Sequence, residues 1–261
     1  MDRLKQLQEW SIYEYNNLFF IEPEFRHNVI MEKINNVIDT YKPKVVVKAG
    51  LGSGKIVLEL INNKNITLVI VESSLRIIEE FIKANSGNPK IKEIRFINGN
   101  FTQFPVDYYA ADLIISIDNL DFQETAPVID EFRRALEFDS YLLLGGVVLH
   151  DDDVEGVYDD FIKLILPIHN DYYLKEDLKT FMNLKHLNFV KGNVEYFDYN
   201  IDEIKNHISG LYGDGNFDTA EKYIEDNREV LSELYNLNER NITVPYFTGL
   251  FIREKVPAKK V

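Results

Sequence analysis

The chain has 261 residues, 45% of them hydrophobic, which is enough to bury one substantial core, so we expect a single globular domain over residues 1–261. Its formal net charge is −14 and no basic stripe stands out. This argues against nucleic acid or an anionic membrane as a partner, because both are bound through Lys and Arg, and favours a small-molecule or protein substrate.

Export and disulfide bonding are not expected. The first residues contain no apolar stretch of signal-peptide length, and no apolar run reaches the roughly 18 residues of a membrane span. The chain has no Cys, which excludes disulfides, thiolate zinc sites and Cys nucleophiles. We therefore expect a cytoplasmic protein.

Residues 1–42 show helical spacing of apolar groups, which predicts a helical N-terminal extension packed over another part of the fold. The region carries an aromatic patch of Tyr13, Tyr15, Phe19 and Phe20. These aromatic side chains could close over a substrate, belong to the core or form the surface of a homodimer.

From residue 45 onward, short apolar segments alternate with amphipathic ones, a pattern typical of a parallel sheet flanked by helices. Strands at this spacing make a doubly wound sheet. We expect five strands, at 45–49, 68–72, 94–98, 112–117 and 146–150, with helices beginning near Lys55, Leu75, Thr125 and Val154. Further along, we expect a helix at 177–184, strands at 189–199 and 244–255, and a helical insertion at 200–242 between these two strands.

The first expected strand runs into the turn Gly50-Leu51-Gly52-Ser53-Gly54. Glycines at alternate positions leave backbone N–H groups bare at the start of the next helix, where a ligand can approach closely. The spacing does not fit a phosphate-binding loop, because Ala49 and Ile56 stand where that motif needs Gly and Ser or Thr. It does not fit the dinucleotide fingerprint either, because Lys55 stands at the third Gly position.

Glu72 ends the second expected strand, about one helix and one strand after the glycine turn. An acid at this place can accept the hydroxyl hydrogen bonds of a ribose. The alternative is that Glu72 caps the next helix from the surface. Its position at the carboxyl end of an apolar strand favours ligand binding.

Five segments, taken in order, resemble the successive motifs of class I S-adenosylmethionine-dependent methyltransferases. They are 45–54, Glu72, 97–101, 112–116 and 144–151, and they span a cofactor-binding core over roughly residues 43–153. The resemblance implies an α/β fold with a doubly wound, mostly parallel seven-stranded sheet. The strands at 189–199 and 244–255 would form the antiparallel hairpin that ends this sheet.

The resemblance also implies S-adenosylmethionine as the cofactor and gives roles to single residues. Gly50, Gly52 and Gly54 would pass beneath the methionine part of the cofactor. Glu72, with Ser73 beside it, would hold the ribose hydroxyls.

Three further positions are compared with the family. Asn100 stands where the family often has an Asp that accepts from the adenine amino group, and an Asn oxygen can also accept. Phe101 could pack on the adenine face or belong to the core. Lys48 replaces the usual acid near the methionine amino group, which turns attraction toward a cationic ligand into repulsion. Lys48 could pair with the ligand carboxylate or with Glu72, or the usual cofactor could have been lost.

Acidic residues follow the fourth and fifth expected strands, whose carboxyl ends face one crevice. Asp118, Asp151 and Asp152 match the metal site of catechol-type O-methyltransferases, which implies Mg²⁺ or another divalent cation. The same acids could instead cap helices or lie in solvated turns. His150 is a candidate general base, because an unperturbed imidazole titrates near neutrality, and Asp118 is the second candidate catalytic residue.

The leading hypothesis is a methyltransferase that acts on an oxygen or nitrogen acceptor of a small molecule. The second is a non-catalytic member of the fold that serves as a binding or assembly module, which is motivated by Lys48 and by the lack of a sharp acceptor-binding motif. The third uses the same cofactor to transfer an aminopropyl or aminocarboxypropyl group.

Overall fold

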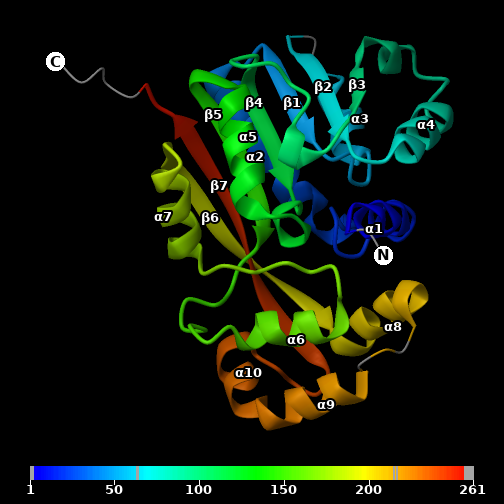
Figure 1. Cartoon of the computed structure of the whole chain (residues 1–261), viewed down its shortest axis with the longest axis vertical. Helices are drawn as coiled ribbons and strands as arrows, with labels where there is room; N and C mark the ends of the chain where they lie inside the picture. Colours follow the sequence, from blue (N-terminus) through cyan, green and yellow to red (C-terminus); the bar gives the residue numbers. More distant parts are fainter. Residues whose placement is uncertain (1–2, 63–64, 214, 216, 256–261) are drawn as a thin grey trace.

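The computed structural model describes residues 3–62, 65–213, 215 and 217–255 (Figure 1). Its centre is a seven-stranded sheet in the order β3-β2-β1-β4-β5-β7-β6. β7 runs antiparallel to both of its neighbours, and the pairs among the other strands are parallel. This confirms the predicted mostly parallel α/β sheet. The strands are β1 (Val45–Ala49), β2 (Thr67–Glu72), β3 (Arg95–Asn98), β4 (Ala111–Ile117), β5 (Leu136–Val147), β6 (Leu187–Asn200) and β7 (Asn241–Arg253).

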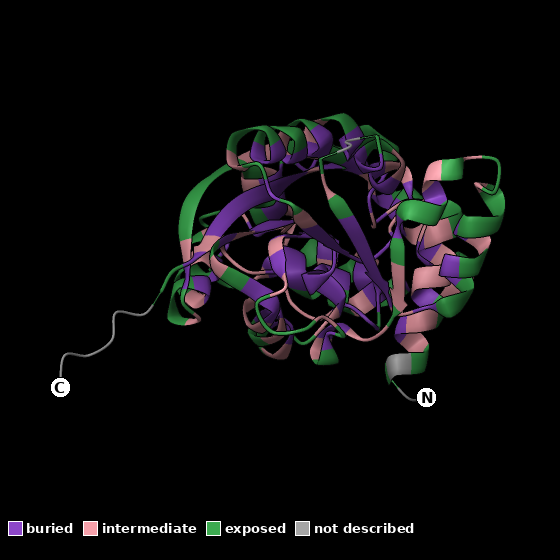
Figure 2. Cartoon of the chain, turned by 90° about the horizontal axis from the view of Figure 1, so that it is seen from above, coloured by how far each residue is buried: buried purple, intermediate pink, exposed green. Residues whose placement is uncertain are grey.

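Helices cover both faces of the sheet, and each face buries its own apolar cluster. Figure 2 shows buried strands between helices whose outer surfaces are exposed. β1 and β4 are nearly continuous apolar runs because both of their faces are covered. One face carries α2 (Glu24–Tyr41), α3 (Lys55–Leu60) and α4 (Leu75–Ala84), and the other carries α5 (Thr125–Ala135) and α7 (Lys175–Leu184).

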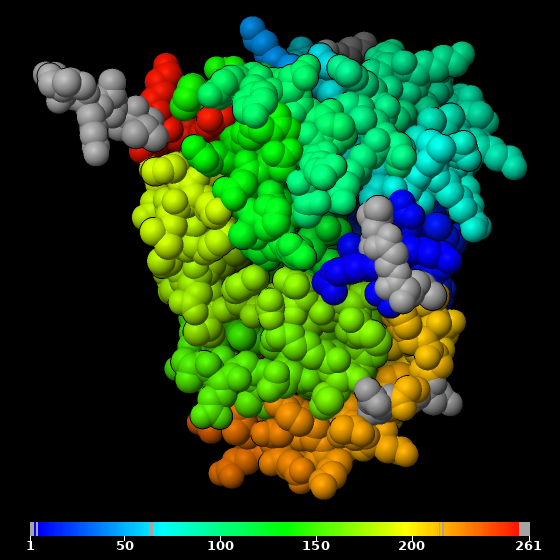
Figure 3. All heavy atoms as spheres, viewed as in Figure 1, coloured from blue at the N-terminus to red at the C-terminus, as the bar shows by residue number. Residues whose placement is uncertain are grey.

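The remaining helices lie beyond the carboxyl ends of the parallel strands and form a third apolar cluster with the ends of β6 and β7 (Figure 1). In Figure 3, α1 fills the space between the sheet part of the molecule and α8. The predicted N-terminal helices and the helical insertion before the last strand are confirmed. The helices beyond the carboxyl ends of the parallel strands are α1 (Arg3–Asn17), α6 (Val157–Ile165), α8 (Ile201–Tyr212), α9 (Phe217–Asp226) and α10 (Arg228–Tyr235). No helix in the described ranges has the length and hydropathy of a membrane span.

The fifth strand was placed wrongly at 146–150, because β5 begins directly after α5 and ends at Val147. Beyond Val147 the chain leaves the sheet: the Val148 N–H donates to the Pro245 carbonyl (3.1 Å), and Leu149 forms an isolated bridge with Leu174. The apolar run continues through both sides of this boundary. Periodicity alone therefore could not locate the strand end.

The helix expected near Val154 begins at Val157 instead. The carboxylate of Asp153 accepts from the N–H groups of Val157 (2.8 Å) and Tyr158 (3.1 Å) and so caps the first turn. Gly156 precedes the helix with φ +74°. At least one acid after the fifth strand is therefore a helix cap, in agreement with the capping alternative.

Candidate functional site

The glycine turn after β1 has a left-handed backbone at each Gly, with φ of +77° at Gly50, +56° at Gly52 and +76° at Gly54. Only Gly adopts this conformation without cost. The protein's own side chains use the space that the missing Cβ atoms leave. A Cβ at Gly50 would lie 2.9 Å from Oδ1 of Asn119, and one at Gly52 would collide with the carboxylate of Glu22.

Lys48 is fully buried and pairs with Glu22. Its ammonium donates to Oε1 of Glu22 (2.5 Å) and to the carbonyl of Gly50 (2.7 Å). The other carboxylate oxygen of Glu22 accepts from the Ser53 N–H (3.2 Å) and hydroxyl (3.3 Å). The alternative in which Lys48 pairs with Glu72 is therefore wrong. The charge of Lys48 is neutralised within the protein, and Glu22 places a carboxylate directly over the glycine turn.

Glu72 is buried at the end of β2 and connects the glycine turn to the following loop. One of its oxygens accepts from the Leu51 N–H (2.8 Å), and the other from the Ser74 N–H (2.9 Å) and the Ser73 hydroxyl (3.2 Å). The N-cap of α4 is Ser74, so Glu72 does not serve as its surface cap. A carboxylate offers about four acceptor sites, which leaves Glu72 capacity for a further hydrogen bond.

Asn100 and Phe101 both follow β3, but their side chains have different surroundings. The Asn100 oxygen accepts from the Thr102 N–H (3.1 Å) and caps the short 3₁₀ helix η2 (Phe101–Gln103). Phe101 is buried and lines a cavity over the carboxyl ends of β1 and β2, whereas Asn100 does not line it. A role for Asn100 in holding adenine stays a prediction.

A small cavity of about 30 Å³, open at its mouth, lies over the carboxyl ends of β1 and β2. Its lining combines the glycine turn and the end of β2 with side chains of α1. Buried apolar surface and a few fixed polar groups are typical of a small-molecule site. The residues that line it include Gly50, Gly52, Glu72, Phe101, Leu7 and Trp10.

Helix α1 is held against this cavity by polar and aromatic contacts. Gln8 donates to the Ser73 carbonyl (3.1 Å), next to Glu72. One oxygen of Glu14 accepts from the N–H groups of the loop at 19–21, and the other pairs with His207 of α8. The Trp10 ring packs against Phe122, with centroids 5.5 Å apart. The N-terminal segment therefore covers the cavity as a fixed part of the fold.

Asp118 lies after β4 with φ +54° and is almost completely buried. Its Oδ2 accepts from the Arg26 guanidinium (3.1 Å) and from the Glu22 N–H (2.8 Å). Burial raises the pKa of Asp118 to about 6, and the nearby charge of Arg26 opposes this increase. In these contacts Asp118 positions the loop that carries Glu22.

The three predicted metal ligands are not brought together. Asp118 points toward Arg26, Asp151 pairs with Lys175 (3.0 Å), and the Asp152 side chain is 80% exposed. Within the described ranges, no group of three or more His, Asp or Glu side chains could hold a metal ion. The prediction of a metal site at Asp118, Asp151 and Asp152 is therefore corrected: these acids pair with cations or face solvent.

His150 is partly exposed, and its Nδ1 accepts from the Asp152 N–H (3.2 Å). It does not line the cavity over the carboxyl ends of β1 and β2. A catalytic role for His150 or Asp118 stays a prediction.

Sequence analysis did not single out Glu22, Arg26 or Trp10. One signal was available: a Lys within an apolar strand requires a buried counter-charge, because an unpaired buried charge is very costly. This signal indicates that Lys48 has an acidic partner, but it does not indicate which residue supplies the acid. No local motif marks Glu22, which precedes Pro23 in an aromatic-rich segment.

The sheet order, the antiparallel β7 and the cavity beside the glycine turn together define the class I S-adenosylmethionine-dependent methyltransferase fold. No family model and no curated protein matches the sequence. Solved structures do match. BH2331 of Bacillus halodurans, described as a candidate methyltransferase, aligns with a TM-score of 0.75 at 11% identity, over 86% of this chain and 98% of that one.

Two further matches show how varied this fold is in function. Geranyl diphosphate C-methyltransferase of Streptomyces coelicolor, solved with Mg²⁺, geranyl diphosphate and S-adenosyl-L-homocysteine, has a TM-score of 0.58 at 11% identity, over 87% of this chain and 78% of that one. The [4+2]-cyclase SpnF has a TM-score of 0.57 at 12% identity, over 86% and 82% of the two chains. At such identities the likeness establishes the fold, and the activity has to be argued from the site.

Proposed function

We propose that this protein is an S-adenosylmethionine-dependent methyltransferase that acts on an oxygen or nitrogen acceptor of a small molecule. The observation that carries the proposal is the buried carboxylate of Glu72 on the wall of the cavity over the carboxyl ends of β1 and β2, beside Gly50, Gly52 and Phe101. A carboxylate with spare acceptor capacity beside a glycine turn and an aromatic ring suits an adenosyl group.

The residues of the chain suit the two ends of this cofactor. Glu72 would accept from one ribose hydroxyl, and the Ser73 hydroxyl offers a second polar group next to it. Phe101 would provide an apolar wall for the adenine. Near Gly52, the Glu22 carboxylate would meet the positively charged amino group of the methionine part. In this arrangement Glu22 takes the place of an acid at position 48, and Lys48 holds Glu22 in position.

When bound, the cofactor supplies a methyl group on an activated sulfonium, so much of the rate comes from alignment of the acceptor. The chain would bind and orient both reactants and exclude water. Helix α1 would help to exclude water, because its residues Leu7 and Trp10 cover the cavity. A divalent cation is not part of the proposal, since the acids predicted to bind it point elsewhere.

Isothermal titration with S-adenosylmethionine and S-adenosylhomocysteine tests the proposal. We expect Glu72→Gln to weaken binding about 10- to 150-fold, because a hydrogen bond to a charged group contributes about 1.5–3 kcal/mol. Glu79→Gln, at an exposed position of α4, is the matched control and should bind as the wild type does. Absence of binding to the wild type, or equal binding by Glu72→Gln, would refute the proposal.

One observation favours a second candidate, a non-catalytic binding module. The Glu22 carboxylate already fills the space next to Gly52, and Lys48 and Ser53 hold it there. The double variant Glu22→Ala with Lys48→Met removes both charges and opens this space. A gain in cofactor affinity would indicate a self-occluded site, and a loss would indicate that Glu22 contacts the cofactor.

A further inference from the structure

Strand β6 forms one edge of the sheet. Its hydrogen-bonded neighbour is β7, and no other described strand lies beside it. It has 14 residues, which makes it longer than most strands of globular proteins. Within the described ranges, residues 188–199 form no backbone–backbone hydrogen bond apart from the pairing with β7. The outward N–H and C=O groups of this edge are therefore available to another strand.

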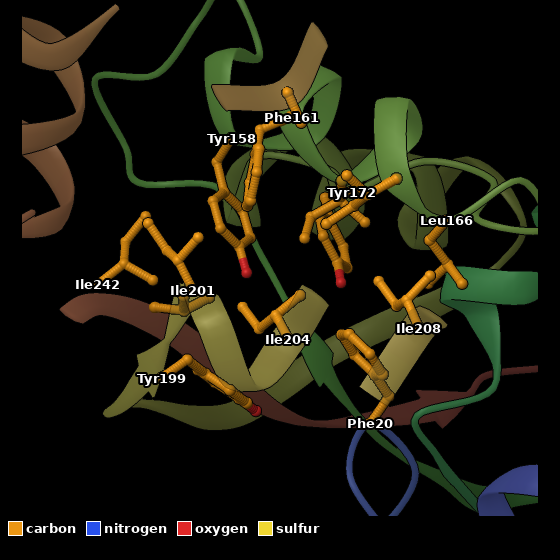
Figure 4. Packing of buried hydrophobic residues seen from close by; sticks show 14 of the residues in the cluster. Phe20, Tyr158, Phe161, Leu166, Tyr172, Tyr199, Ile201, Ile204, Ile208 and Ile242 are labelled. Atoms are coloured by element: carbon orange, nitrogen blue, oxygen red, sulfur yellow. The ribbon is translucent and has the colours of Figure 1, made fainter. Parts of the chain in front are cut away.

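The middle of β6 is open to solvent and carries apolar side chains. Residues 189–193 are all exposed, and Phe189, Val190 and Tyr196 are 38%, 40% and 60% exposed. The end of the strand differs, because Tyr199 belongs to the buried apolar cluster that Figure 4 shows. A long, exposed edge with apolar side chains is a surface that a second chain can cover by pairing with it.

Two features restrict what can pair with this edge. A β-bulge between Phe189 and Lys191 interrupts the ladder, so that regular pairing starts at Lys191. The Lys191 ammonium lies 5.7 Å from the centroid of the Tyr41 ring and forms no ion pair with a described acid. A Lys on an exposed edge discourages an incoming strand unless that strand places an acid opposite the Lys.

β6 itself contains such an acid at Glu195. One oxygen of Glu195 pairs with Lys33 of α2 (3.0 Å), and the other is buried without a hydrogen-bond partner. Lys191 and Glu195 are four residues apart, so their side chains point to the same face of the sheet. Their Cα atoms are separated by about 13 Å along the strand, which is too far for an ion pair within one chain. The two side chains can meet only across two strands.

We propose that two copies of this chain associate by antiparallel pairing of their β6 edges about a two-fold axis at Asn193. In this register Lys191 lies opposite Glu195 of the second copy, and Gly192 lies opposite Val194 of the second copy. Because a two-fold axis repeats every contact, the interface contains two pairs of Lys191 with Glu195. The two seven-stranded sheets continue as one sheet across the interface.

The charges of β6 favour this register over its neighbours. An axis at Lys191 or at Glu195 would place two like charges opposite each other, which is destabilising. An axis one residue to either side of Asn193 would place Lys191 opposite Asn193 or Phe197 and give no direct ion pair. The complementary charges lie within the same strand, so a second copy of this chain matches the edge better than an unrelated strand does.

Sedimentation velocity of the full-length protein over a range of concentrations tests the inference. We expect a monomer–dimer equilibrium for the wild type. Lys191→Glu replaces both attractive pairs with repulsive ones and should weaken the dimer at least about tenfold. Lys83→Glu makes the same change of charge at an exposed position of α4, so it is the matched control and should dimerise as the wild type does.

A charge-swapped variant tests the predicted contact directly. Lys33→Glu combined with Glu195→Lys keeps the ion pair within each chain with its signs reversed. It places a cation opposite Lys191 of the second copy and should also weaken self-association. An equimolar mixture of this double variant with Lys191→Glu should form dimers again, because both contacts across the interface are then attractive.

Three results would overturn the inference: a wild type that stays monomeric at every concentration, a dimer that Lys191→Glu weakens no more than Lys83→Glu does, or folded charge-swapped variants that do not associate when mixed. Thermal melting identifies a variant that fails to fold. Lys191 is exposed and has no acidic partner, so Lys191→Glu decides the question even if the double variant does not fold. The assay contains no cofactor, so its outcome is independent of the proposed function.

Discussion

The buried pair of Lys48 and Glu22 allows a quantitative prediction. Both side chains are essentially inaccessible to solvent, at 0% and 2% exposure. Lys48→Met leaves the Glu22 carboxylate with only its Ser53 contacts, and Glu22→Gln leaves the ammonium without a counter-charge. Loss of one partner of a buried pair costs about 3–5 kcal/mol, because the remaining charge stays desolvated and uncompensated.

The assay is thermal unfolding of the two single variants and the double variant. At about 2–4 °C per kcal/mol for a domain of this size, each single substitution should lower the melting temperature by about 6–20 °C. The double variant should lose less than the sum of the single losses, because no charge is left unpaired. The matched control is the exposed pair Arg76 and Glu80, where Arg76→Met with Glu80→Gln should have little effect.

Two results would refute this reasoning. If both single variants melted within about 2 °C of the wild type, the charges would not be desolvated as their burial indicates. If the losses of the single variants were simply additive in the double variant, Lys48 and Glu22 would not interact energetically.

Two further predictions concern Asp118 and Gly52. Burial raises the pKa of Asp118 from 3.8 to about 6, so between these pH values the folded protein keeps the Asp118 carboxyl protonated while the unfolded chain has lost the proton. The contribution of this protonated carboxyl to the free energy of unfolding is therefore fully present below pH 3.8. It falls by about 3 kcal/mol as the pH rises through 6. Urea unfolding at several pH values should show this loss in the wild type relative to Asp118→Asn, and parallel pH curves would contradict it. Gly52→Ala should cost about 1–3 kcal/mol, because φ is +56° and the added Cβ meets the Glu22 carboxyl group. Gly87→Ala, whose Cβ would have no atom within 4 Å, is the control, and equal melting of the two variants would be the contrary result.

Local pattern was sufficient for much of the sheet. β1 was predicted with its observed bounds, because the apolar run between Pro43 and Gly50 is delimited on both sides. The starts of α3, α4 and α5 at Lys55, Leu75 and Thr125 were also predicted. Such elements depend on signals within a few residues, such as a Gly turn or a Ser cap. The end of β5 lacks such a signal, since pairing with β7 determines where the strand stops.

The sequence by itself determined the order of strands and helices, the glycine turn and the position of Glu72 at the end of β2. Only the tertiary structure decided which acid neutralises Lys48, because Glu22 reaches it from a loop 26 residues away. It also turned Asp118 toward Arg26 and away from Asp151. The physical reason is that a buried charge requires an opposite charge within a few ångströms, and the packing of the N-terminal segment against the sheet selects the partner.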